Sequence, residues 1–116
     1  MKMTLETEPL ILQIKRVSSD ILGKDVTTFK GFSERQLKAI AEQTILVEMG
    51  IATGEITEAT QDFFLKSIKD LVKNFTETLK GLMLVTINKL YNAILDLIWN
   101  SIKTATNVVL PSFSVI

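Results

Sequence analysis

The stretch LMLVTINKLYNAILDLIWNSIKTATNVV, residues 82–109, decides the fold. It carries only Lys89, Asp96 and Lys103 as charged residues, and its apolar side chains are too many for one face of a helix. At about 100° per residue, these side chains spread over roughly 240° of a helical wheel. We therefore predict that a helix over 82–106 packs against more than one neighbour.

The apolar residues of this segment form two adjacent seams with the alternating three- and four-residue spacing of coiled coils. Because the rest of the chain is small, we expect further copies of the chain to cover part of this surface. The alternative is that both seams lie inside one intrachain core. The predicted oligomer interface consists of Met83, Ile87, Leu90, Tyr91, Ile94, Leu95, Ile98, Trp99 and Ile102.

A membrane span over residues 82–102 is the competing interpretation, since about 20 apolar residues cross a bilayer. The Leu, Ile and Val side chains contribute about −5 kcal/mol to insertion, whereas Lys89 and Asp96 near the centre cost roughly 2.5 to 3.5 kcal/mol each. The sum is near zero or unfavourable. A holin-like or pore-forming protein that inserts residues 82–102 is therefore the alternative function, and a membrane is the less favoured partner.

The segments before residue 82 predict three more helices. Pro9 suits the first turn of a helix over 9–22 that Gly23 ends, and residues 24–32 form a loop. Ser33 and Gln36 have the spacing of a capping box for a helix over 34–49 that stops at Gly50.

Thr57 is the predicted N-cap of a helix over 58–80. Gly81 either kinks or breaks the run that continues to residue 106. Without a break, residues 58–106 would form a rod of roughly 70 Å. A compact domain of this mass has a radius of gyration of about 13 Å, so the chain folds back near Gly81 or the rod belongs to an assembly. Residues 107–116 form an apolar extended tail after the helix.

Composition excludes several functional classes. The chain has 116 residues, the size of one domain over 1–116, and its 13 basic and 13 acidic residues cancel. No nucleic acid is expected as a partner, because clustered positive charge is lacking. Histidine and cysteine are both absent, which removes the commonest general base and the thiolate nucleophile. The start, MKMTLETEPL, does not resemble a signal peptide.

Two charged clusters are candidates for a catalytic or ligand site. Glu55, Glu58 and Asp62 are the closest carboxylate cluster and the candidate for an oxygen-ligand metal site, but acidic residues at a helix N-terminus explain their spacing better. Lysines on one face of the helix over 58–80 alternate with acidic residues at i, i+4, which favours a solvated, self-neutralised face over a phosphate-binding one. That face contains Lys66, Lys69, Lys73 and Lys80 with Asp62, Asp70 and Glu77.

The sequence thus predicts an all-α helical bundle of three or four helices that forms a homo-oligomer through its C-terminal helix. It predicts no catalytic residue, no cofactor and no metal ligand. The expected function is that of a non-enzymatic structural or assembly protein, cytoplasmic or virion-associated, of the kind found among accessory proteins of bacteria and their phages. A larger protein assembly is a further possible partner.

Overall fold

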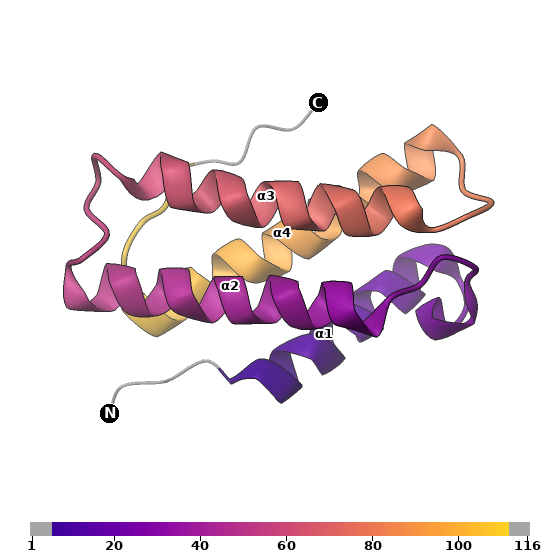
Figure 1. Cartoon of the computed structure of the whole chain (residues 1–116), viewed down its shortest axis with the longest axis horizontal. Coiled ribbons are helices and arrows are strands. Elements are labelled where there is room, and N and C mark those ends of the chain that lie inside the picture. Colours follow the sequence, from indigo (N-terminus) through magenta and orange to yellow (C-terminus); the bar gives the residue numbers. More distant parts are fainter. Residues whose placement is uncertain (1–5, 112–116) are drawn as a thin grey trace.

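The computed structural model describes residues 6–111, which form a four-helix bundle (Figure 1). The predicted all-α class is confirmed, and no strand occurs within this described range. The helices are α1 (Thr7–Leu22), α2 (Glu34–Thr53), α3 (Gln61–Thr78) and α4 (Leu84–Thr106), and a short 3-10 helix, η1 (Val26–Thr28), lies between α1 and α2.

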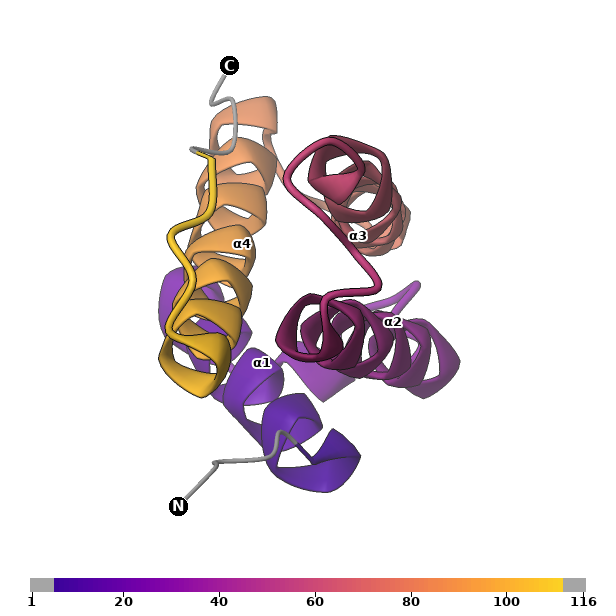
Figure 2. The ribbon, with the colours of Figure 1, turned by 90° about the vertical axis from the view of Figure 1, so that its left-hand side faces the viewer.

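The four helices pack in chain order around a common core, so that α1 contacts α2, α2 contacts α3, and α3 contacts α4. The ring closes where α4 packs against α1, and α4 also reaches across the core to α2 (Figure 2). The radius of gyration is 13.9 Å, and the molecule measures 41 × 28 × 19 Å. The longest dimension is 41 Å, so residues 58–106 do not form the continuous 70 Å helix and the chain folds back instead.

Gly81 lies in a true break between two helices. Its φ of +80° belongs to the left-handed region, which disfavours side chains with a Cβ. Leu79 is already extended, and the amide of Lys80 donates a hydrogen bond of 2.8 Å to the carbonyl of Lys30. The single long helix that the sequence allowed over 58–106 is therefore two antiparallel helices. α4 begins at Leu84, two residues later than expected.

The predicted ends of the first loop are confirmed. Gly23 caps α1 in the left-handed conformation, with its amide 2.9 Å from the carbonyl oxygen of Ser19. The Ser33 hydroxyl accepts a hydrogen bond of 3.3 Å from the amide of Gln36 and so caps α2. The side-chain oxygen of Gln36 accepts a hydrogen bond of 3.0 Å from the hydroxyl of Thr78, which ties the start of α2 to the end of α3.

The predicted end of α2 at Gly50 is wrong. The helix continues to Thr53 and ends at Gly54, whose φ is +83°. Gly50 remains inside the helix, and it is buried because the side chain of Ile56 packs onto the space where a Cβ would stand. The amide of Ile56 also donates a hydrogen bond of 2.9 Å to the Gly50 carbonyl. The glycine therefore permits a close contact and does not act as a stop.

The predicted start of α3 at residue 58 is also wrong, and the helix begins at Gln61. Thr57 and Thr60 form a turn before it: the Thr60 hydroxyl accepts a hydrogen bond of 2.9 Å from the Thr57 amide. The Thr57 carbonyl accepts from the amides of Thr60 and Gln61, both at 2.9 Å. Threonine side chains compete in this way with helical hydrogen bonds, which delays the helix by one turn.

The core runs through all four helices. In α3, the buried side chains include Leu65, Ile68 and Phe75. In α1, Leu10 and Ile14 are buried, whereas Ile21 is exposed. Helix α4 packs against all three other helices, which satisfies within one chain the requirement for more than one packing surface. Its fully buried side chains are Leu90, Ile94, Leu95, Ile98 and Ile102.

Candidate functional site

A groove of about 630 Å³ lies between α3 and α4. Its floor is largely apolar, and its rim on α3 is charged. The apolar residues that line it include Leu65, Leu84, Ile87, Tyr91, Trp99 and Pro111. The charged residues that line it are Asp62, Lys66, Lys69, Asp70, Lys73 and Glu77.

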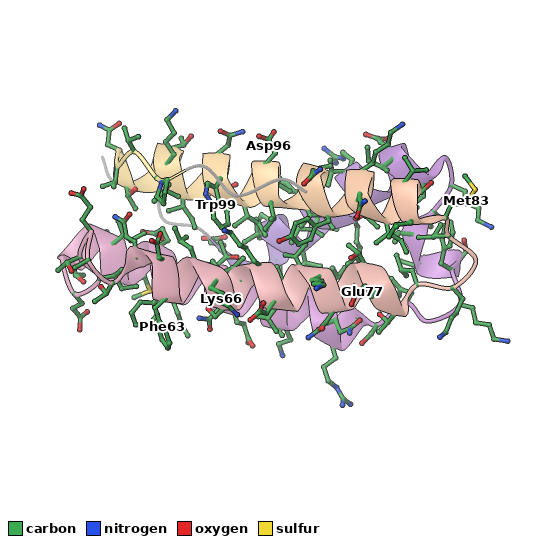
Figure 3. All side chains as sticks on the ribbon, turned by 90° about the horizontal axis from the view of Figure 1, so that it is seen from above. Phe63, Lys66, Glu77, Met83, Asp96 and Trp99 are labelled. Atoms are coloured by element: carbon green, nitrogen blue, oxygen red, sulfur yellow. The ribbon has the colours of Figure 1, made fainter. Side chains whose placement is uncertain are left out.

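Trp99 fixes the end of the groove nearest Pro111. Its indole N–H donates a hydrogen bond of 2.9 Å to the carbonyl oxygen of Pro111, which holds the chain after α4 against the helix. The ammonium of Lys69 lies 6.0 Å from the centre of the indole ring, at the outer limit of a cation–π contact. In Figure 3, Trp99 projects from α4 toward α3, whereas Asp96 points away from the groove.

Tyr91 lies on the floor of the groove and is partly covered. Burial raises the pKa of its phenol, and the negative charge of Asp70 on the rim raises that pKa further. Both causes favour the neutral phenol over the phenolate. At neutral pH, the groove therefore presents a hydroxyl among apolar side chains.

The rim of the groove on α3 carries charges of alternating sign. We call Lys66, Asp70, Lys73 and Glu77 the α3 charge stripe; each of them is exposed. Lys66 and Asp70 form the expected i, i+4 ion pair at 3.0 Å, with side chains 72% and 59% exposed. A pair this exposed contributes little to stability. The stripe remains accessible to another molecule.

Exposed apolar residues lie at both ends of α3. Met83, Leu84 and Val85 form what we call the α4 corner, and they are 68%, 72% and 55% exposed. Phe63, at the start of α3, is 75% exposed. Figure 3 shows Phe63 and Met83 at opposite ends of α3, with Lys66 and Glu77 between them.

The structure divides the nine predicted interface residues into two groups. Six are buried within this chain: Leu90, Ile94, Leu95, Ile98, Trp99 and Ile102. Five of them are fully enclosed, so a partner could not touch them without opening the bundle, whereas Trp99 is 8% exposed and lines the groove. Ile87 and Tyr91 are partly exposed on the groove floor, and Met83 is exposed at the α4 corner. Accessible contacts in the predicted set are therefore confined to the groove and the corner.

Sequence reasoning missed Phe63, Leu84 and Val85. Phe63 lies outside the apolar stripe of α3 on a helical wheel, which is a usable signal of exposure. No comparable signal existed for Leu84 and Val85, because their exposure follows from the break at Gly81. If α3 and α4 formed one continuous helix, the helical turns before and after Leu84 and Val85 would flank these side chains.

The other chemical candidates do not assemble into a site. Within residues 6–111, no group of three or more carboxylates is arranged to hold a metal ion. Glu55 instead accepts a hydrogen bond of 3.0 Å from the hydroxyl of Thr53. Glu48 is buried on α2, and its Oε1 has no hydrogen-bond partner among the described residues. None of the described helices has the length and apolar character needed to cross a bilayer.

The fold and groove define a small four-helix domain with an amphipathic groove between α3 and α4. No protein-family model, curated protein or solved structure matches the chain.

Proposed function

We propose that this chain is a non-enzymatic helical assembly protein that associates with copies of itself. The observation that carries the proposal is the α4 corner, where three consecutive large apolar residues are more than half exposed. Contiguous exposed apolar surface is typical of protein–protein contact sites. The corner is continuous with the groove, because Leu84 belongs to both.

The sequence supports a non-catalytic role. Without histidine or cysteine, the candidates for acid–base or nucleophilic chemistry are carboxylates, lysines, hydroxyls and one tyrosine. In the groove, Lys66 is paired with Asp70, and acids and bases line the rim in equal numbers. This arrangement suits recognition of a mixed-charge protein surface. A place among the accessory or virion proteins of bacteria and phages remains part of this proposal.

The contact surface proposed here differs from the one predicted from the sequence. Residues such as Leu95 and Ile98 are fully enclosed, so they stabilise the protomer. The proposed contacts are those that the folded protomer still exposes, namely the α4 corner and the adjoining groove floor at Ile87 and Tyr91.

The test is the mass of the protein in detergent-free buffer, measured by sedimentation equilibrium over a range of micromolar concentrations. We expect a mass above the 13.0 kDa of one chain that falls on dilution. Leu84→Asp should restore the single-chain mass and leave the helical circular dichroism unchanged. Leu12→Asp is the matched control, since Leu12 is 59% exposed on α1 and lies outside the groove.

A mass of 13.0 kDa for the unmodified protein at every concentration would contradict self-association. An equal loss of mass in Leu84→Asp and Leu12→Asp would contradict the choice of the α4 corner.

A further inference from the structure

We propose that two copies of this chain associate with their α3 helices antiparallel, through the α3 charge stripe and the apolar residues at its two ends. This inference rests on the proposed self-association and specifies its geometry. The partner surface is the same surface on a second copy, as in any two-fold symmetric dimer.

The spacing of the stripe allows two helices to stay in contact along their length. Phe63, Lys66, Asp70, Lys73 and Glu77 follow one another within α3 at intervals of 3, 4, 3 and 4 residues, and Lys80 lies in the turn after the helix. This is the spacing that keeps residues on the contact face of two nearly aligned helices. All six are exposed, so the face is not occupied by the chain's own helices.

The order of charges makes this face complementary to itself in one orientation. In the antiparallel arrangement centred between Leu71 and Val72, Lys66 of one copy meets Glu77 of the second copy. Asp70 likewise meets Lys73, and each pair occurs twice by symmetry. In a parallel arrangement every residue would face its own copy, and four like-charge contacts would result. Like charges placed together across an interface repel each other, so the pattern selects the antiparallel orientation.

The same arrangement brings the exposed apolar residues together. Phe63 lies about 13 Å from the centre along the helix axis, and at the same sequence separation on the other side α3 has ended and the turn at Lys80 follows. Phe63 of one copy therefore meets the turn after α3 of the second copy, beside Met83 and Leu84. These are the most exposed apolar residues at the two ends of α3, at 75%, 68% and 72%.

The two kinds of contact have different roles. Exposed ion pairs add little binding free energy but set orientation and register. Burial of the Phe63 ring against Met83 and Leu84 removes apolar surface from water and supplies the affinity. We therefore expect a dimer that dissociates on dilution and that high salt weakens through screening of the stripe.

Charge reversal provides a sharp test. Lys66→Glu places two carboxylates against each other at both contacts with Glu77, and Glu77→Lys places two ammonium groups against each other at both contacts with Lys66. Each variant alone should therefore be monomeric at concentrations where the unmodified protein dimerises. In a dimer of one Lys66→Glu copy and one Glu77→Lys copy, both contacts join opposite charges. One contact joins the two substituted positions, with the signs exchanged, and the other joins the original Glu77 to the original Lys66. We expect it to form a heterodimer, detectable by native mass spectrometry at twice the single-chain mass.

Lys38→Glu is the matched control, because it makes the same change in net charge as Lys66→Glu at an exposed position on α2. We expect its dimer dissociation constant to match that of the unmodified protein, whereas each stripe reversal should raise the constant about tenfold or more. Phe63→Ser is an independent variant that leaves the stripe intact and should also weaken the dimer.

The outcomes separate this inference from the proposed function. If the unmodified protein oligomerises but both stripe reversals and Phe63→Ser leave its mass unchanged, the antiparallel α3 geometry is overturned and self-association stands. If the two reversals abolish the dimer and their mixture fails to restore it, the pairing of Lys66 with Glu77 is overturned. A monomeric unmodified protein would overturn both proposals.

Discussion

At the residue scale, Tyr91 is the side chain whose chemistry the fold changes most clearly. Burial on the groove floor raises the pKa of its phenol above the ordinary value of 10.0, and Asp70 adds to the effect. The chain contains a single tyrosine, so the near-ultraviolet absorbance of phenolate reports on this residue alone. The environment of Tyr91 can therefore be followed by absorbance without attaching a probe to the protein.

We expect the absorbance titration of Tyr91 to have its midpoint above pH 10.0, and Asp70→Asn to move that midpoint downward. The unfolded chain loses this proton first as the pH rises. Stability is therefore unaffected below the unfolded pKa, decreases as the pH rises through it, and stops decreasing above the folded pKa. Tyr91→Phe should remove this part of the alkaline destabilisation. A midpoint at or below 10.0 would contradict the burial of the phenol.

At the element scale, the ends of the helices are held by contacts between segments far apart in sequence. The loop at Lys30 and Gly31 lies against the end of α3, where the Lys30 carbonyl accepts from the Lys80 amide. Gly31 has a φ of +91°, and a Cβ at this position would collide with the backbone carbonyl of Thr78. Gly31 therefore allows the loop before α2 to lie close to the end of α3, whereas Gly81 allows the backbone to turn between α3 and α4.

Gly31→Ala should destabilise the protein more than Gly81→Ala does. Both positions have positive φ, which costs a non-glycine residue about 1–2 kcal/mol. Gly81 has open space where a Cβ would stand, so only this cost applies there. At Gly31, the backbone of α3 must also move. Urea denaturation of the two variants gives the comparison, and equal losses of stability would show that the contact with Thr78 is unimportant.

The helices themselves were predictable because each has local signals. The apolar period of α3, the cap at Ser33 and the left-handed glycine at Gly23 depend on neighbours a few residues away. The errors occurred where side-chain contacts beyond the helical pattern intervened. Ile56 packs onto Gly50, where a larger residue would collide with it, and this role of the glycine cannot be inferred from its immediate neighbours.

At the scale of the whole molecule, α4 is the central helix of the protomer. It packs against the other three helices, and its two apolar seams lie mainly on those helices. The prediction that α4 requires several neighbours was correct. Whether other copies contribute further neighbours stays a prediction, and it now concerns the α4 corner, the groove and the outer face of α3.

Truncation of side chains on α4 and at its N-cap should separate core from contact surface. Ile98→Ala removes a fully buried side chain and should lower the free energy of unfolding by about 2–5 kcal/mol. Met83→Ala, at a side chain 68% exposed, should change it by less than about 0.5 kcal/mol. Thermal denaturation at a concentration where the protein is monomeric measures both. Comparable losses would mean that Ile98 is not enclosed in the protomer.

The sequence by itself determined the helical class, the approximate helices and the need of residues 82–109 for more than one packing surface, because these follow from local periodicity, caps and glycines. Only the tertiary structure decided that Gly81 breaks the long run and that the chain's own helices cover six of the nine predicted interface residues. Exposure depends on which helices meet, and that is a property of contacts between distant segments. The same folding back leaves Met83, Leu84 and Val85 uncovered at the corner, and there the tests of association begin.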